Sequence, residues 1–291
     1  MVKISDPLPS VDDSEAAAYD ANIRDLQGSA KCPINIYSEE LKSSIDTIEA
    51  IVSEAVNRSP NIIFDITSFP KRWFFPIVRL LLESDDVKNL MIVYTKGDRH
   101  AVTLSENPEV LRVLPGFLSL DERSEHDFAF VGVGFHTHSM LMMFGEDKAK
   151  SLQMLFPFPP GPPGIRRNWK FAQQVERIVQ KDETLPDRLD PIRYVPLEAI
   201  DVGQVFDALN MITNGGRKTS VMAPYGPKTF SLGMCLFALA AEQADRPEIP
   251  VFYSQPQRYA VDYTSAAAYV DGRLDSWAYA VKFNGKNLYK L

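Results

Sequence analysis

The sequence predicts an α/β fold built from two mostly parallel β-α-β halves, followed by a small β-rich tail. Three observations support this fold class. Strand-like and helix-like segments alternate over residues 34–95, the alternation resumes over residues 128–254, and one short loop motif follows a strand in both stretches. We expect four parts in the chain: a peripheral arm (1–33), a first half (34–126), a second half (127–256) and the C-terminal β-rich tail (257–291).

The elements of the first half follow from the spacing of its apolar residues. Apolar side chains recur at helical intervals over 39–57, where Ser38 is a suitable N-cap, and a strongly apolar helix is indicated over 71–84. Short apolar runs typical of buried strands lie around these helices, at 34–37, 61–66 and 90–95. The polar arm before them contains one short predicted helix, over 14–26.

The second half repeats the alternation after a less regular segment with a predicted turn at Pro115-Gly116. Strands are expected at 128–133, 152–156, 192–195, 218–223 and 251–253, and helices at 139–149, 169–179, 202–213 and 229–244. The stretch "PFPPGPPG" cannot form regular helix or a central strand. In the tail, Asn284-Gly285 is typical of a tight β-hairpin turn.

Composition narrows the class of protein. The chain has 291 residues with a formal net charge of −7, which argues against a protein that binds duplex nucleic acid, because contacts to phosphates dominate such binding. The two cysteines cannot form a disulfide framework, so a reducing cytoplasm is the expected location. No signal peptide is predicted, and no apolar stretch is long enough to span a membrane, so we expect no membrane association.

Familiar catalytic and cofactor motifs are absent from the sequence. It contains no Walker A sequence, no G-x-G-x-x-G fingerprint, no G-x-S-x-G elbow and no HExxH motif. This argues against the common ATPase, dehydrogenase, hydrolase and zinc-protease classes. No cofactor and no metal site are therefore predicted, and no nucleophile can be named.

A loop motif occurs once in each half. "DITSFPK" (65–71) and "MAPYGPK" (222–228) both follow a predicted strand and both precede a predicted apolar helix. Each ends in a Pro-Lys pair, and a proline is sterically suited to the first turn of a helix. The loops therefore bring a lysine and the amino end of a helix to the carboxyl end of a strand.

This combination suits an anionic ligand. Helix amino ends carry unpaired N–H groups and bind phosphate, and ligands of open α/β sheets lie beyond the carboxyl ends of the strands. In this interpretation lysines supply charge, hydroxyl groups donate to phosphate oxygens, and Asp65 either accepts from a ribose hydroxyl or organises the loop. The predicted ligand-binding residues are Asp65, Thr67, Ser68, Lys71, Thr95, Tyr225, Gly226, Lys228 and Thr229. The alternative is that the two loops only begin helices, because Pro-Lys pairs are common.

The strand–loop–lysine–helix arrangement resembles the "TGGTK" ligand loop of CARF domains, which are Rossmann-like sensors of cyclic oligonucleotides in prokaryotic defence. The related SAVED domains join two CARF-like units in one chain, as the duplicated loop would here. The resemblance covers about a dozen residues in each half. It departs from the motif because Ser68-Phe69 replaces the double glycine in the first loop, and only Gly226 remains in the second. The resemblance implies two Rossmann-like halves, a nucleotide ligand and partner proteins of a multi-subunit system.

Histidines provide the second group of candidates. His136 and His138 follow the predicted strand 128–133 and could act as general acid or base, or bind a metal with ligands such as His126 and Asp127. The alternative is a polar loop at the end of a strand. Asp98 and His100 follow strand 90–95, so they share the expected ligand edge or lie in a solvated loop.

Three functional hypotheses remain open from the sequence. The first is a sensor or accessory subunit that binds a phosphorylated nucleotide in a prokaryotic defence system. The second is a nucleotide-processing hydrolase or transferase that uses Asp65 with His136 or His138. The third is a non-catalytic interaction subunit that has kept the fold. The lack of a recognisable nucleophile with a paired base favours binding without rapid turnover.

Overall fold

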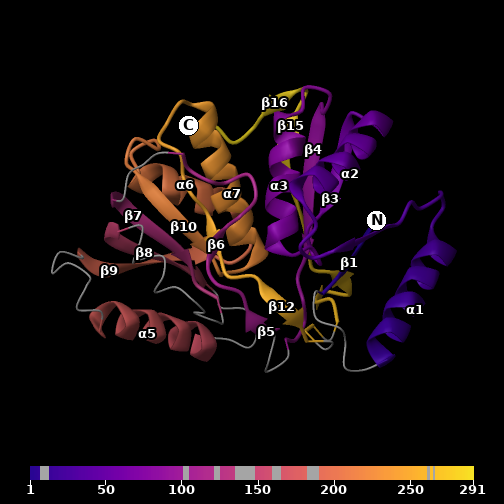
Figure 1. Ribbon diagram of the computed structural model, residues 1–291, viewed down its shortest axis with the longest axis horizontal. Helices are drawn as coiled ribbons and strands as arrows, with labels where there is room; N and C mark the ends of the chain where they lie inside the picture. Colours follow the sequence, from indigo (N-terminus) through magenta and orange to yellow (C-terminus); the bar gives the residue numbers. More distant parts are fainter. Residues whose placement is uncertain are drawn as a thin grey trace.

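The computed structural model describes residues 1–6, 13–100, 105–120, 125–134, 148–158, 165–181, 190–260, 263–264 and 266–291. These residues form an α/β fold, as predicted, with two four-stranded sheets among them (Figure 1). Within the described residues, no helix is both long and apolar enough to cross a membrane.

The first sheet has the strand order β16-β15-β4-β3. Strands β3 (Asn61–Asp65) and β4 (Asn89–Thr95) are parallel and are joined by helix α3 (Lys71–Glu83). The helix forms over the predicted range because apolar residues cover most of its surface, and Trp73, Phe74 and Val78 are completely buried. The sheet's outer face exposes 72% of Ile63 and 40% of Met91.

The predicted tail is part of the first sheet. Strand β15 (Ser276–Phe283) pairs antiparallel with β4, with Trp277 opposite Tyr94, and forms a hairpin with β16 (Lys286–Asn287). The hairpin turn is at Asn284-Gly285, as predicted, and both residues have positive φ, 48° and 75°. The antiparallel β15 makes the first sheet mixed.

The second sheet is wholly parallel and has the order β10-β7-β8-β9. Its strands have the following bounds: β7 (Glu125–Gly132), β8 (Lys148–Phe158), β9 (Asp190–Glu198) and β10 (Ser220–Pro224). Their apolar composition fits a sheet that is covered on both faces. Together with the parallel pair β3–β4, this sheet confirms the predicted fold class.

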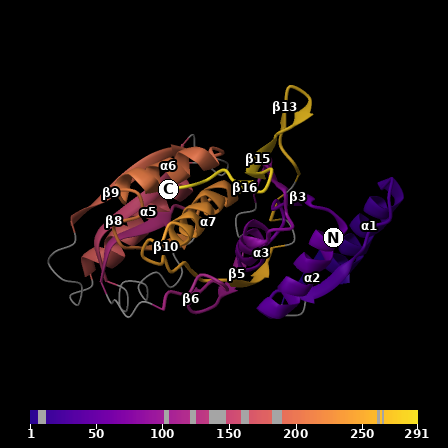
Figure 2. The same ribbon diagram turned by 90° about the horizontal axis from the view of Figure 1, so that it is seen from above.

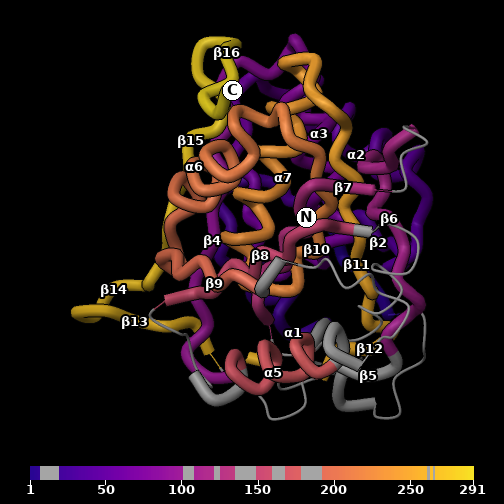
Figure 3. Tube along the Cα trace, turned by 90° about the vertical axis from the view of Figure 1, so that its left-hand side faces the viewer, coloured from indigo at the N-terminus to yellow at the C-terminus, as the bar shows by residue number. Residues whose placement is uncertain are grey.

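Helices cover both faces of the second sheet (Figure 3). Helix α5 (Ile165–Lys181) buries Phe171 and Val175 in one core, whereas α6 (Val202–Ile212) and α7 (Lys228–Gln243) pack in the other. The glycines that end α6, Gly215 and Gly216, have φ of 69°, which agrees with the predicted turn.

Helices α3 and α7 lie side by side at the centre of the molecule, between the two sheets (Figures 1 and 2). One continuous core joins residues of the first sheet, such as Ile92, to residues of the second, such as Phe130, through these helices. Every residue of α7 from Thr229 to Ala241 is buried. Removal of this apolar surface from water therefore helps to hold the two halves together.

The amino-terminal region differs from the prediction. The strand expected at 34–37 forms at 37–40 (β2, Tyr37–Glu40); among the described residues it pairs only with β1 (Val2–Ser5) and does not extend the first sheet. Helix α1 (Asp13–Ser29) is longer than expected. Helix α2 (Ile45–Arg58) begins six residues later than predicted. The Ser44 hydroxyl, and not Ser38, caps it by accepting from Thr47 N at 3.3 Å. Ser38 is instead in the ladder with β1, which apolar spacing does not reveal.

Short strands complete the structure. Strand β5 (Ser105–Pro108) pairs with β12 (Pro256–Tyr259), β6 (Arg112–Val113) pairs with β11 (Phe252–Tyr253), and β13 (Tyr269–Val270) with β14 (Arg273–Leu274) forms a hairpin that projects from the body (Figure 2). The predicted turn at Pro115-Gly116 is present. The predicted helix 139–149 ends in strand β8, and its residues 139–147 lie outside the described residues.

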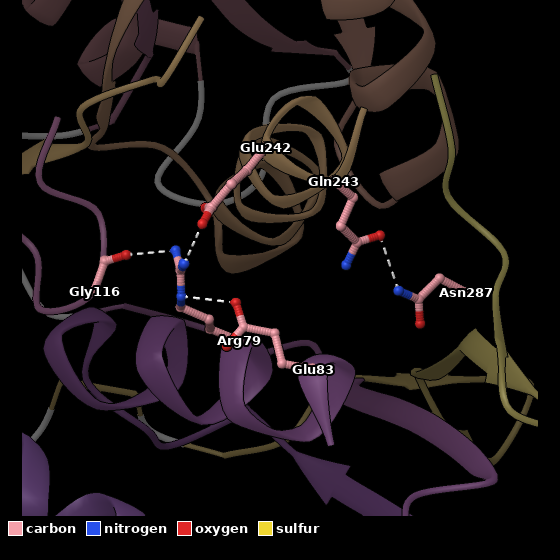
Figure 4. Close-up of polar contacts among 6 residues, drawn as sticks. All are labelled: Arg79, Glu83, Gly116, Glu242, Gln243 and Asn287. Atoms are coloured by element: carbon pink, nitrogen blue, oxygen red, sulfur yellow. Dashed lines mark hydrogen bonds and ion pairs between the residues drawn. The ribbon is translucent and has the colours of Figure 1, made fainter. Parts of the chain in front are cut away.

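Arg79 ties the carboxyl ends of the two central helices together (Figure 4). From α3 it forms an ion pair with Glu242 of α7 at 2.5 Å and one with Glu83 at 2.9 Å, and it donates to the Gly116 carbonyl at 2.6 Å. Beside this cluster, Asn287 Nδ2 donates to Gln243 Oε1 at 3.0 Å. The guanidinium therefore connects α3, α7 and the turn that follows β6.

We expect Arg79→Met to lower the free energy of unfolding by about 1–2 kcal/mol, because its carboxylate partners are partly exposed and each such contact contributes little. Urea unfolding of both proteins measures the difference. The control is Arg58→Met, which removes only an exposed ion pair with Glu54 within α2. An equal effect of the two substitutions would contradict a special role for Arg79.

Candidate functional site

The two repeated loops meet at the centre of the molecule. Lys71 begins α3 after strand β3, and Lys228 begins α7 after strand β10, each directly behind an N-cap proline. Parallel strands end at these loops, so the loops lie at the carboxyl edges of the two sheets. The placement at strand ends is the one that the sequence predicted.

Each lysine crosses to the other loop. Lys71 Nζ donates to the carbonyl oxygens of Pro224 and Gly226, the latter at 2.9 Å. Lys228 Nζ donates to the carbonyl oxygens of Ile66 and Thr67, at 3.0 and 2.5 Å. We call this reciprocal arrangement the crossed-lysine junction. The sequence predicted that each lysine would begin a helix at the carboxyl edge of a sheet. It did not predict that the two would meet or that each would bind the backbone of the opposite half.

Lys71 occupies a position where α/β sheets bind ligands. In the second sheet, the chain passes from β7 to β8 on one side and returns through α6 to β10 on the other. The strand order therefore switches between β7 and β10, and ligands of such sheets bind beyond this point. The acceptors of Lys71 are in the last residue of β10 and in the loop that follows it, so its amine lies at the switch point of the other half.

Close backbone approach fills the rest of the switch point. A Cβ atom at Gly134 would lie 2.0 Å from the Tyr225 carbonyl oxygen, and one at Gly226 would lie 3.0 Å from the Val133 oxygen. The absence of side chains at these glycines thus admits neighbouring protein backbone. Gly226, which the sequence predicted as a ligand-binding residue, thus lies against protein backbone.

Burial dominates the electrostatics of the junction. Lys71 is only 7% exposed, and loss of hydration, reinforced by the charge of Lys228, holds its pKa well below the ordinary value. Burial also lowers the pKa of Lys228, to about 7, and the Asp65 carboxylate opposes this shift. A neutral amine has two N–H donors, and each lysine donates to two carbonyl groups.

The first loop is organised by its own polar side chains. Asp65 Oδ1 accepts from Thr67 N, Thr67 Oγ1 accepts from Thr95 N, and Thr95 Oγ1 shares a hydrogen bond with Ser276 Oγ, each at 2.8 Å. Of the two roles considered for Asp65, the structure thus contains the loop-organising one. Ser68 is exposed at the tip of this loop.

The second loop is closely packed. Thr229 is completely buried and donates to the Ala199 carbonyl at 2.5 Å, so its hydroxyl is engaged within the protein. The ring of Tyr225 lies 5.6 Å from that of Tyr253 and 6.1 Å from that of Phe171. Within the described residues, the open part of the site is therefore the first loop.

A group of tyrosines near the junction was missed by sequence reasoning. The Lys71 amine lies 5.0 Å from the centre of the Tyr253 ring, and Tyr259 packs against Tyr263, with ring centres 5.9 Å apart. Desolvation raises the pKa of Tyr253, Tyr259 and Tyr263. His100 joins them, with Nδ1 3.2 Å from Thr264 Oγ1. The sequence "FYSQPQRYAVDYTS", which is rich in tyrosine, could have indicated this group.

The histidine candidates are only partly placed. His136 and His138 lie outside the described residues. Their suggested companions, His126 and Asp127, are at the amino end of β7, the opposite end from the junction, and Asp127 there accepts from Thr219 N at 3.1 Å. Asp98 is exposed beside Arg99. Across the described ranges, no group of three or more His, Cys, Asp and Glu is arranged to hold a metal ion.

Comparisons with known proteins give little beyond the fold. No family model matches the sequence, and no curated protein matches it. Among solved structures, one similar chain is described as a universal stress protein of Pseudomonas aeruginosa UCBPP-PA14, with 11% identity and a TM-score of 0.25 over 88% of this chain and 82% of that one. A TM-score this low carries no inference about ligand or activity.

Proposed function

We propose that this protein binds a phosphorylated nucleotide at the crossed-lysine junction and acts as a sensor or accessory subunit. One observation carries the proposal. The amino ends of α3 and α7, each with a lysine, converge at the carboxyl edges of two sheets. In a chain with net charge −7, this places two amines and two helix dipoles together, with the Asp65 carboxylate acting on Lys228.

The first loop is the proposed entry for the phosphate. Ser68 and Asp65 are exposed there, and α3 begins behind them without a side-chain cap. A phosphate at this point would add a direct charged acceptor for the amines, because the carbonyl oxygens that they now bind are neutral. The amines would then be held in their charged form, which strengthens their hydrogen bonds.

The proposed biological setting rests on the resemblance of the two loops to those of CARF and SAVED sensors. It implies a cyclic oligonucleotide as ligand, and partner proteins in a prokaryotic defence system. The described residues include no nucleophile with a paired base at the junction, which favours binding over turnover. Turnover through Asp65 and His136 is the competing function, and the same experiment tests both.

The test follows binding by titration calorimetry and products by chromatography, with AMP, ATP, NAD, cyclic AMP and cyclic dinucleotides. We expect at least one ligand to bind without rapid product formation. Lys71→Ala/Lys228→Ala should weaken this binding by roughly 10- to 150-fold, the loss of about 1.5–3 kcal/mol for a charge-assisted contact. Lys282→Ala is the control, because Lys282 is also a buried lysine but is bound within the first half, to the Leu82 and Ser84 carbonyls.

Three outcomes would contradict parts of the proposal. Equal affinity of wild type and the double variant would remove the junction as the site. Rapid product formation that is lost in His136→Ala would replace the sensor by an enzyme. Absence of binding across the whole panel would favour the interaction subunit.

A further inference from the structure

We propose that the crossed lysines are a latch between the two halves, which an anion opens by drawing both amines away from the carbonyl groups that they bind. The inference rests on the proposed function for the identity of the trigger. The latch itself rests on the geometry of the junction and of the two central helices.

The latch connects the two loops at the carboxyl edges of the sheets. Lys71 belongs to the first half and binds the second, and Lys228 belongs to the second half and binds the first. All four acceptors are backbone carbonyls in the two loops. Withdrawal of both amines therefore breaks these polar contacts between the two loops. The hydrogen bonds between the strands of each sheet stay intact.

An anion can compete for these amines. A hydrogen bond from an ammonium group to a phosphate oxygen is roughly twice as strong as one between neutral groups. Lys71 now occupies the switch point of the second sheet, so a ligand that seats there must displace it. Without ligand, the Lys71 side chain fills the ligand position. When a ligand displaces it, the contacts between the two loops change, so that binding is coupled to a conformational change.

The far ends of the same two helices are held by different contacts. Arg79 of α3 joins Glu242 of α7 and the Gly116 carbonyl, near the carboxyl ends of both helices (Figure 4). Arg79 is eight positions beyond Lys71 in α3, which is about 12 Å along the helix axis. Release of the junction therefore allows the amino ends of α3 and α7 to separate while Arg79 acts as the pivot.

The test measures the distance between two spin labels, one in each half, by pulsed electron–electron double resonance. Spin labels are attached at Glu49→Cys on α2 and Gln173→Cys on α5, two exposed positions, in a Cys32→Ser background. Hydrogen exchange of the two loops is measured in the unlabelled protein. We expect Lys71→Ala/Lys228→Ala to lengthen and broaden the distance distribution without ligand, and to speed loop exchange roughly tenfold or more.

Lys282→Ala should leave both readouts as in wild type, because its acceptors are within one half. Pyrophosphate, ATP and a cyclic dinucleotide, added to wild type, should produce the same lengthening as the double variant. A double variant with the wild-type distribution and exchange would overturn the latch. A double variant that opens, with a wild type that no anion opens, would overturn the anion as trigger and would count against the proposed function, independently of the latch.

Discussion

Gly134→Ala is expected to destabilise the protein by about 3 kcal/mol or more, at or above the usual cost of an overpacked site. The added Cβ would lie 2.0 Å from the Tyr225 carbonyl oxygen and 2.7 Å from its carbon. Both are backbone atoms, so no rotamer change relieves the clash. Tyr225 is fixed by its contacts with Phe171 and Tyr253, and the carbonyl of the next residue, Gly226, is an acceptor of Lys71.

The measurement is urea unfolding of Gly134→Ala beside Gly28→Ala. A Cβ at Gly28 has no neighbour within 4 Å and lies in helix α1, where alanine is the better helix former. The control should therefore equal or slightly exceed the wild type in stability. A Gly134→Ala protein within 0.5 kcal/mol of wild type, a margin of about the size of ordinary surface substitutions, would show that the loop and β7 do not pack as described.

The second expected result is a rise in the free energy of unfolding between about pH 7 and 8.5. The pKa of Lys228 is about 7 in the folded protein and that of Lys71 is also lowered, whereas an unfolded lysine titrates near 10.5. The unfolded chain therefore binds more protons in this window, so stability increases with pH. Each lysine can contribute up to about 1.4 kcal/mol per pH unit.

The upper limit of this pH window is set by groups whose ionisation changes the stability in the opposite direction. Burial raises the pKa of Cys235 and of tyrosines such as Tyr259, so the folded state retains protons that the unfolded state releases, and stability falls at higher pH. The comparison is with Lys71→Met/Lys228→Met, which keeps these groups. We expect its profile to be flatter than that of wild type. Parallel profiles would show that the two buried amines do not titrate as the structure requires.

The sequence was a good guide to elements with a strong local signal. The apolar helix after Pro70 and the run of buried strands in the second half were predicted within a few residues, and the turn at Asn284-Gly285 was placed correctly. Errors arose where long-range pairing decides the outcome. The strand expected at 34–37 forms instead at 37–40, beside β1, and β15 joins β4 across about 180 positions. A local pattern can encode neither pairing.

The position of each loop at a strand end was predictable from the sequence, whereas the meeting of the two loops and their contacts were not. Pro-Lys pairs at two strand ends correctly placed Lys71 and Lys228 at the carboxyl edges of the sheets. Which atoms the amines bind depends on how α3 and α7 pack, and that packing is set by apolar surfaces far along each helix. Thr229 shows the same limit, because a hydroxyl in the first turn of a helix is directed by its neighbours, and here it is bound to Ala199.

The position of β15 in the first sheet also has a consequence for the order in which the protein can fold. The second half is contiguous in the chain, from β7 to α7, and its parallel sheet can form from neighbouring segments. The first half is discontinuous, because β4 stays without its antiparallel partner until residues beyond the second half have been synthesised. During translation the first half must therefore wait, with one side of β4 open, while the second half is completed. A ribosome-bound chain that stops before β15 should thus show native-like protection in the second half alone.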